Sequence, residues 1–137
     1  MQHETELKVR FVETDAIGHV NNVSYYIYLE QARIEFLESL GTAMTISDWK
    51  FVVVHMNLDF VGQSYFNDRL NVTTNIRRIG TKSFTLVHRI YRKETGETVV
   101  EGEAVLVYFN FDTQESESMP ESLKNQLIPY QRSRETV

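Results

Sequence analysis

The sequence has no cysteine. This absence excludes disulfide scaffolds, iron–sulfur clusters, thiolate zinc sites and cysteine nucleophiles. The histidines are few and have no metal-ligand spacing, so we expect neither a metal nor a cofactor; they are His3, His19, His55 and His88. No apolar run comes near the roughly 20 residues of a membrane-spanning helix. The acidic segment after Met1 also lacks the apolar core of a signal peptide. We therefore expect a cytoplasmic protein with no membrane partner.

Length and composition favour one ordinary globular domain. The chain has 137 residues, of which 42% are hydrophobic and 24% are charged. Domains cluster at roughly 100–150 residues, and this balance is typical of a folded chain rather than a disordered one. A domain of this size removes about two-thirds of its unfolded surface from water, so its core needs no covalent or metal staple. We expect a single domain over residues 1–137.

Positive charge is scarce overall but concentrated in one stretch. The formal net charge is −5, which disfavours binding to nucleic acid. The stretch Arg69–Lys93 nevertheless contains no acid and holds seven of the 14 lysines and arginines. Two interpretations remain open. The stretch is either a solvated strand face or a docking surface for a polyanionic ligand such as a nucleotide, since guanidinium groups bind phosphates bidentately.

The spacing of apolar residues changes along the chain. Polar and apolar residues alternate over 6–11, as in a half-buried strand. Over Val23–Leu40 apolar residues recur at spacings of three and four, which predicts a helix with one apolar stripe. Asn21 or Asn22 can cap its start, and Gly41 fits its end. Four segments with a period of two follow, joined by short turns: 51–61, 69–79, 82–92 and 98–111.

This order of elements predicts an α+β fold. A single long helix cannot bury its apolar stripe by itself, and short turns favour antiparallel neighbours. The economical arrangement is a curved antiparallel sheet of about five strands wrapped around the helix. Two small residues in the last long strand, Gly102 and Ala104, leave room for the helix to lie close. The polar tail from Ser116 is expected to fray, although 121–131 has a helical pattern.

The functional signal lies between Glu13 and Asn22, just before the predicted helix. A carboxylate, a glycine, a histidine and two amides gather there. Free backbone N–H groups at a helix start bind an anion or a polarised carbonyl oxygen. A carboxylate a few residues upstream can act there as a general base on water or as a nucleophile. From spacing alone a structural interpretation stays open, in which Asp15 caps a turn and Asn21 caps the helix.

The motif Asp15–Asn22 (DAIGHVNN), followed by Tyr25 and by Leu29–Arg33 (LEQAR), resembles the signature of the 4-hydroxybenzoyl-CoA thioesterase family. The segments 51–60 and 77–84 are similar to strands of that family and occur in the same order. The resemblance implies the hotdog fold, in which a curved antiparallel sheet wraps one long helix. It also implies hydrolysis of an acyl-CoA thioester. The variant with His-Val-Asn-Asn resembles the members that act on fatty acyl-CoAs.

The resemblance implies roles for particular residues. Asp15 matches the catalytic aspartate, and the backbone N–H of Asn22 matches the amide that polarises the thioester carbonyl. Further substrate contacts are expected from Gly18, His19, Asn21, Asn22, Tyr25 and Asn57. Contacts to the phosphates of CoA are expected from Arg77, Arg78, Lys82 and Ser83. Family members bind CoA near a subunit interface, and we expect a homodimer or homotetramer.

Two other functions remain open at this point. One is a hotdog dehydratase or isomerase that acts on acyl thioesters, with His19 as its acid or base. The other is a protein that binds acyl-CoA without converting it. A hydrolysis assay that detects the released thiol separates these functions from a thioesterase.

Overall fold

The structure, a computed structural model, describes residues 1–132. Its principal elements are, in chain order, β1 (His3–Lys8), α1 (Asn22–Ser39), β2 (Phe51–Phe60), β3 (Arg69–Ile79), β4 (Ser83–Arg92), β5 (Thr98–Asn110), β6 (Glu115–Ser116) and α2 (Glu121–Leu127). Short 3-10 turns lie at Phe11–Glu13, Ile46–Asp48 and Ile128–Tyr130. The predicted order of one strand, one long helix and four strands is confirmed.

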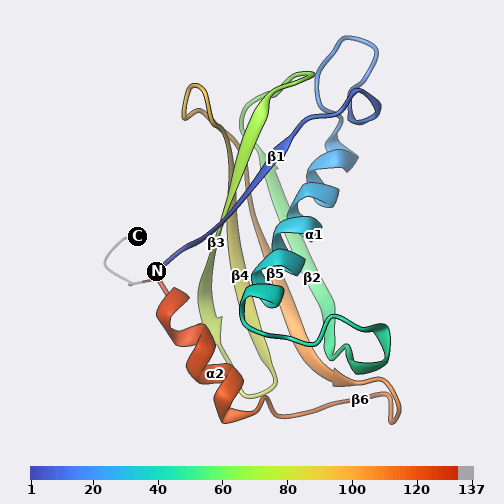
Figure 1. Cartoon of the computed structure of the whole chain (residues 1–137), viewed down its shortest axis with the longest axis vertical. Helices are drawn as coiled ribbons and strands as arrows, with labels where there is room; N and C mark the ends of the chain where they lie inside the picture. Colours follow the sequence, from blue (N-terminus) through green and yellow to red (C-terminus); the bar gives the residue numbers. More distant parts are fainter. Residues whose placement is uncertain (133–137) are drawn as a thin grey trace.

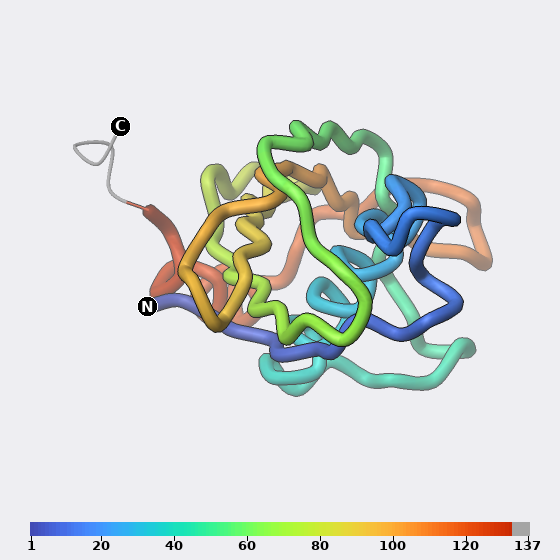
Figure 2. The backbone as a smooth tube through the Cα atoms, turned by 90° about the horizontal axis from the view of Figure 1, so that it is seen from above, coloured from blue at the N-terminus to red at the C-terminus, as the bar shows by residue number. Residues whose placement is uncertain are grey.

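The strands form one antiparallel sheet in the order β1-β3-β4-β5-β2, and the two-residue β6 pairs with the end of β5. The sheet curls around α1 (Figure 1). In the view from above, the helix lies within the arc that the strands describe (Figure 2). The α+β hotdog arrangement expected from the sequence is therefore confirmed.

The approach of α1 to the sheet depends on Gly102 in β5. A Cβ atom at this position would lie 2.9 Å from the carbonyl oxygen of Asn57 and 3.4 Å from Cδ1 of Leu29 on α1. A side chain here would push either the neighbouring strand or the helix away. The prediction that small residues in this strand let the helix lie close is confirmed at Gly102.

A polar layer crosses the space between α1 and the sheet. By register, His3, Thr74 and His88 stand side by side on β1, β3 and β4. Burial, reinforced by the positive charge of Arg33 on α1, lowers the pKa of His88 to about 3, so this histidine is neutral in the folded protein. On each side of this polar layer, buried apolar residues form a separate cluster. The layer therefore divides the core into a part near the start of α1 and a part near its end.

The C-terminal segment is packed on the core as far as it is described. Met119, Leu123 and Leu127 are buried in the same apolar cluster as Phe36. The expectation that the chain frays from Ser116 is therefore wrong for residues 116–132, because apolar residues spaced four apart give α2 a buried face. Residues 133–137 lie outside the described part. The first strand also differs, since β1 spans residues 3–8 rather than 6–11.

The hairpin of β3 and β4 defines two opposite ends of the molecule. The turn between these strands lies at one end, whereas the start of β3 and the end of β4 lie at the other, beside the loop that precedes α1 (Figure 1). β3 has 11 residues. At about 3.3 Å per residue, such a strand is roughly 35 Å long.

Candidate active site

Asp15 lies in a tight loop before α1. Its Oδ1 accepts hydrogen bonds from the backbone N–H groups of Ile17 (2.9 Å) and His19 (3.1 Å). Its own N–H donates to the carbonyl oxygen of His19 (2.8 Å). Gly18 adopts φ +84°, a left-handed conformation that helps to close the loop. Oδ2 accepts no hydrogen bond from residues 1–132, and the residue is exposed. Asp15 thus caps its turn with one oxygen and leaves the other free for chemistry.

The first turn of α1 has unused hydrogen-bond donors. Asn21 is the N-cap residue, and its Oδ1 accepts hydrogen bonds from the N–H (2.9 Å) and Oγ (2.8 Å) of Ser24. The predicted capping role of Asn21 is therefore confirmed. The backbone N–H groups of Asn22 and Val23 find no acceptor within the described part of the chain. These donors and the positive end of the helix dipole favour an oxygen atom that carries negative charge.

A cavity of about 270 Å³ brings Asp15, the start of α1 and the end of β2 together. Its lining residues are Asp15, His19, Val20, Asn22, Tyr25, Phe60, Gly62 and Gln63. Four residues predicted for the site therefore share one cavity: Asp15, His19, Asn22 and Tyr25. Gly18 and Asn21 shape the neighbouring backbone without lining it.

The segment that follows β2 borders the site as well, although residue type and spacing did not predict this. Gly62 lies so close to β5 that a Cβ atom would be 2.6 Å from the carbonyl oxygen of Thr98. Ser64 is fully buried, and its hydroxyl hydrogen-bonds to the hydroxyl of Tyr25 (2.7 Å). Its carbonyl oxygen accepts the N–H of Val20 (2.9 Å). The Gly-Gln-Ser run indicates a turn from sequence alone but does not reveal that it borders the site.

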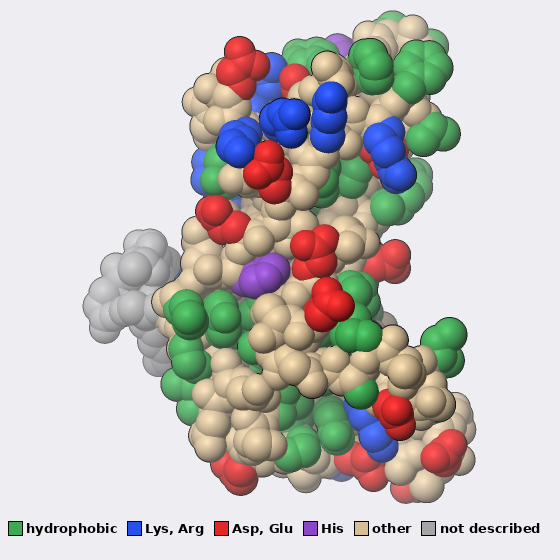
Figure 3. Space-filling model, in the orientation of Figure 1, with side chains coloured by type: hydrophobic (Ala, Val, Ile, Leu, Met, Phe, Trp, Pro, Cys, Tyr) green, Lys and Arg blue, Asp and Glu red, His purple; other side chains and the backbone are tan. Residues whose placement is uncertain are grey.

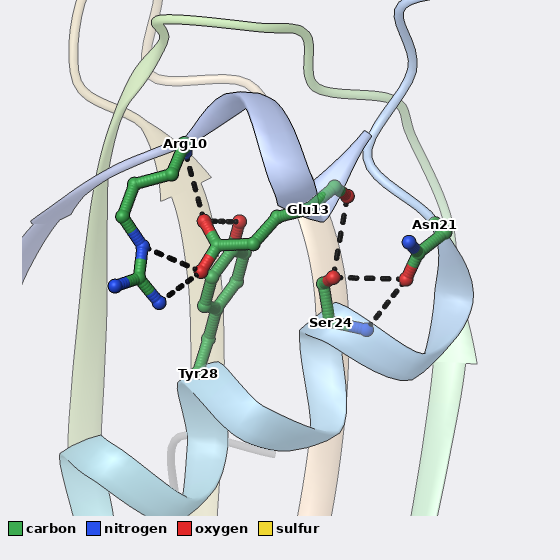
Figure 4. Close-up of polar contacts among 5 residues, drawn as sticks. All are labelled: Arg10, Glu13, Asn21, Ser24 and Tyr28. Carbon is green, nitrogen blue, oxygen red and sulfur yellow. Dashed lines mark hydrogen bonds and ion pairs between the residues drawn. The ribbon is translucent and has the colours of Figure 1, made fainter. Parts of the chain in front are cut away.

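A buried carboxylate, Glu13, ties the Asp15 loop to α1 (Figure 4). Its Oε1 accepts the backbone N–H of Arg10 and the O–H of Tyr28, each at 2.8 Å. Its Oε2 accepts two hydrogen bonds from the Arg10 guanidinium, at 2.6 and 3.0 Å. Burial alone raises the pKa of Glu13, but the hydrogen bonds from Arg10 and Tyr28 outweigh it, so the pKa is lowered. Glu13 is therefore an ionised, enclosed group, in contrast to Asp15.

Asn57 does not line the Asp15 cavity. Its neighbours in β2, Met56 and Leu58, pack against the core. Side chains alternate along a strand, so Asn57 lies on the face of the sheet turned away from α1. There it lines a different cavity, which carboxylates also border. Within one protomer, the predicted substrate contact from Asn57 is not brought to the Asp15 loop.

The arginine-rich stretch Arg69–Lys93 does not form one surface. Because β3 and β4 form a hairpin, Arg77, Arg78 and Lys82 lie at its turn, far from Asp15 in the same protomer. The remaining basic residues of the stretch lie toward the other end, where Figure 3 shows lysine and arginine side chains gathered over the upper part of the molecule. The stretch as a whole is therefore not one docking surface, and the expected CoA contacts at Arg77, Arg78 and Lys82 stay a prediction.

The two basic groups also differ in how far acids neutralise them. At the Asp15 end, Glu6 forms ion pairs with Arg69 and Lys93, and Asp68 forms one with Arg92. At the turn, Arg77 forms an ion pair with Glu103 at 2.8 Å. Arg78 and Lys82 have no ion-pair partner within residues 1–132. Arg89 also lacks an ion pair there, but it donates hydrogen bonds to Thr98 and Gly96. Arg78 and Lys82 donate no side-chain hydrogen bond within the described residues, so both are free to meet a phosphate.

An apolar surface adjoins the cavity. Val23, Tyr26 and Ile27 are exposed on the first turns of α1, and Phe60 and Val61 are exposed at the end of β2. The rings of Tyr26 and Phe60 are 6.5 Å apart, so the two groups meet. β2 is an edge strand of the sheet. An unpaired edge beside exposed apolar side chains is typical of an interaction surface.

The described residues offer neither a metal cluster nor a membrane helix. Within residues 1–132, no three histidine, aspartate or glutamate side chains converge in a way that could hold a metal ion. In the same part of the chain, no helix combines the length and the apolar character needed to cross a membrane.

Fold and site together define a hotdog domain with a carboxylate beside the free N–H groups of its central helix. The family model for the thioesterase-like superfamily matches residues 9–127, and the chain belongs to that superfamily. The chain is also 29% identical over 126 residues to the long-chain acyl-CoA thioesterase FadM of Escherichia coli (strain K12). That match covers 90% of this chain and 96% of FadM.

Solved structures agree with this assignment. A predicted thioesterase from Bacillus stearothermophilus is 30% identical, with a TM-score of 0.90 and coverage of 97% of this chain and 98% of that one. A thioesterase from Thermus thermophilus, complexed with coenzyme A and Zn, is 26% identical with a TM-score of 0.81. It covers 90% of this chain, which in turn covers 95% of it. The expectation of an enzyme that hydrolyses thioesters is confirmed.

Proposed function

We propose that the protein hydrolyses fatty acyl-CoA thioesters to the free acid and CoA. The observation that carries this proposal is the shared cavity of Asp15 and the start of α1. Within residues 1–132, Oδ2 of Asp15 and the backbone N–H groups at the start of α1 have no hydrogen-bond partner, and they flank one space, as attack on a carbonyl group requires. The superfamily, and a relative named as a long-chain acyl-CoA thioesterase, support the same chemistry.

In the proposed reaction the thioester oxygen lies at the N–H groups of Asn22 and Val23, which stabilise the negative charge that it gains. Oδ2 of Asp15 takes a proton from the attacking water or itself attacks the carbonyl carbon. Either way one water is consumed, the bond to sulfur breaks and CoA leaves as a thiol. Because Ile17 and His19 hold Oδ1, the reactive oxygen is already in position.

A single turnover in water labelled with heavy oxygen tests the nucleophilic route. A nucleophilic Asp15 forms an anhydride with the acyl group, and water that opens this anhydride at the aspartyl carbon leaves label in the protein. A general base directs all the label to the released fatty acid, as does water that opens the anhydride at the acyl carbon. Label found by mass spectrometry in the peptide that contains Asp15 therefore establishes the nucleophilic route.

We further propose a homodimer joined through β2. This strand forms one edge of the sheet, and Val53, Val54 and Phe60 on it are exposed. A two-fold axis near the middle of β2 pairs the two edge strands antiparallel, which covers both edges at once. The end of β2 that lines the Asp15 cavity then faces the start of the partner's β2.

This pairing brings the basic turn of one subunit to the catalytic loop of the other. The start of β2 adjoins the end of β5, which adjoins the start of β4. The partner's β3–β4 turn is then about three strand spacings, or roughly 15 Å, from the Asp15 cavity. We propose that CoA phosphates contact Arg78 and Lys82 of the partner subunit, with Arg77 and Ser83 beside them.

The acyl group is proposed to be aliphatic. Val23, Tyr26, Ile27 and Phe60 extend an apolar surface away from the cavity, which suits a flexible hydrocarbon chain. The finer resemblance to the 4-hydroxybenzoyl-CoA thioesterase family stays a prediction, and within that family we favour the members that act on fatty acyl-CoAs.

An assay of thiol release from acyl-CoAs tests the function. We expect release from fatty acyl-CoAs at a higher kcat/KM than from benzoyl-CoA. A dehydratase or isomerase would change the acyl group without releasing a thiol, and a binding protein would retain acyl-CoA unchanged. Either of these results overturns the proposal.

A further inference from the structure

We propose that Glu13 is a positioning residue that holds the Asp15 loop in its reactive geometry, a role that rests on the proposed hydrolysis of acyl-CoA. Glu13 precedes Asp15 by two residues and is 6% exposed. As the last residue of the 3-10 turn Phe11–Glu13, it contacts the residue before that turn, the start of α1 and the second turn of α1 (Figure 4).

The backbone of Glu13 closes the loop at its neck. Its carbonyl oxygen accepts hydrogen bonds from the N–H of Asn21 (3.0 Å) and from Oγ of Ser24 (3.2 Å). Next to it, Thr14 and Val20 form an antiparallel bridge. The loop that carries Asp15 therefore enters and leaves through one hydrogen-bonded neck, directly at the helix start that provides the free N–H groups.

The carboxylate of Glu13 fixes the position of this neck relative to α1. Oε1 accepts the O–H of Tyr28, which is buried on α1. Burial and the hydrogen bond to Glu13 raise the pKa of Tyr28, so the tyrosine remains a donor. The pair with Arg10 compensates the buried charge of Glu13. Oδ2 of Asp15 is thereby held at one distance from the first turn of α1.

Glu13 is not suited to act as the base itself. Four hydrogen bonds occupy its two carboxylate oxygens. Its side chain is enclosed, and it does not line the cavity that contains Asp15. A change at Glu13 should therefore alter the placement of the base and leave its identity unchanged.

The test compares Glu13→Gln and Tyr28→Phe with a matched control, Glu38→Gln. Glu13→Gln keeps the size of the side chain but turns an amide group toward the donors of Arg10. Tyr28→Phe removes one hydrogen bond and leaves the ionised carboxylate and its pair in place, so this variant should fold even if Glu13→Gln does not. Glu38 is exposed near the end of α1, so its change to Gln alters the same chemical group away from the loop.

For Glu13→Gln we expect kcat to fall by about 10- to 100-fold, the scale of a small misplacement of a reacting group. KM should change by less than about threefold, because substrate binding groups are untouched. The acid limb of the pH–rate profile should remain, since Asp15 still supplies the base. Tyr28→Phe should show a smaller loss of kcat with the same pattern, and Glu38→Gln should show no loss.

Amide hydrogen exchange provides a readout that does not need activity. We expect faster exchange at Ile17, His19 and Asn21 in both loop variants and unchanged exchange in the paired strands β3 and β4. If the wild-type protein releases no thiol, the proposed function fails, while the exchange data still decide whether Glu13 holds the loop.

Three results overturn the positioning role. One is a kcat within about twofold of wild type in a folded Glu13→Gln variant, even where exchange is faster. Another is loss of the acid limb, which would make Glu13 the base. The third is unchanged exchange in the loop of Glu13→Gln and Tyr28→Phe.

Discussion

The two ends of the molecule carry the two parts of the proposed site, and they are built differently. At one end, hydrogen bonds within a short loop and the first turn of a helix place Asp15 beside the free N–H groups. At the other end, Arg78 and Lys82 stand at a hairpin turn without an ion-pair partner in residues 1–132. One end is complete within a single chain, whereas in the proposed dimer the other end acts only when a second subunit brings it to Asp15.

In this proposal catalysis depends on one chain, whereas CoA binding depends on assembly. The Asp15 loop is closed by contacts between residues close in sequence, so the fold of one chain suffices to form it. The proposed CoA site requires groups separated by the length of β3. Variants at each end, and at the edge between subunits, should therefore fail in different ways.

The largest effect is expected at the catalytic end. Asp15→Asn keeps Oδ1 as the acceptor for Ile17 and His19 but replaces Oδ2 by an amide group that is neither base nor nucleophile. We expect kcat to fall on the order of 10²-fold or more, with little change in Tm. Thiol release and thermal unfolding provide the measurements. Activity near the wild-type level would move the catalytic role to His19, the other titratable side chain that lines the cavity with Asp15 and Tyr25.

The second largest effect is expected at β2, the edge strand through which the proposed dimer forms. Val54→Lys places a charge near the middle of an exposed edge strand, so that two lysines meet at the proposed two-fold axis. Light scattering should show a monomer that is still folded by circular dichroism. Activity should fall at least about tenfold, because each site loses its partner's hairpin. A variant that stays dimeric, or a monomer with full activity, contradicts the assembly.

A smaller effect is expected at the hairpin turn. In a variant that combines Arg78→Glu and Lys82→Glu, KM for acyl-CoA should rise about tenfold while kcat changes little, since exposed charges contribute roughly 1 kcal/mol each. The control reverses two charges at the opposite end, in Arg69→Glu with Lys93→Glu. A larger rise of KM in the control would place the phosphates of CoA on the Asp15 end of the same subunit.

Mixing variants sharpens this test. Consider a heterodimer of one Asp15→Asn subunit and one subunit with Arg78→Glu and Lys82→Glu. It contains one site in which Asp15 comes from one chain and a native hairpin comes from the other. After mixed refolding, activity at low substrate concentration should recover to about a quarter of wild type, because half the dimers are mixed and half their sites are native. No recovery would mean that both groups act within one subunit.

The smallest effect on activity is expected for the polar layer between the two ends. The pKa of His88 is lowered from 6.5 to about 3 in the folded protein by burial and by Arg33. The unfolded chain therefore binds this proton below about pH 6.5 and the folded protein does not, so stability falls as pH drops from about 6.5 toward 3. One such group contributes on the order of 1.4 kcal/mol per pH unit over that window.

Chemical denaturation of wild type and His88→Gln between neutral and acidic pH measures this contribution. The difference in unfolding free energy between the two proteins should shift with pH in the stated direction, while kcat near neutral pH stays close to wild type. A pH-independent difference would show that His88 takes up its proton in the folded state as readily as in the unfolded chain.

Residue type and spacing predicted the elements and the loop that carries Asp15. The helix over 22–39, its cap at Asn21 and the turn at Gly18 depend on residues that contact near neighbours, so spacing and residue type suffice to predict them. The alternating strands and the order of turns also predicted a curved sheet around one helix. Asp15 could be found for the same reason, since its partners lie within the same short loop.

Which residues distant in sequence lie close together depends on the three-dimensional fold. Hairpin formation split the basic stretch between two ends, and strand alternation placed Asn57 on the face away from α1. The contact of Ser64 with Tyr25 joins residues 39 positions apart. The composition of the C-terminal segment is polar, but α2 packs its apolar side chains against the core. These outcomes depend on register and on which surfaces meet, and a one-dimensional pattern does not contain that information.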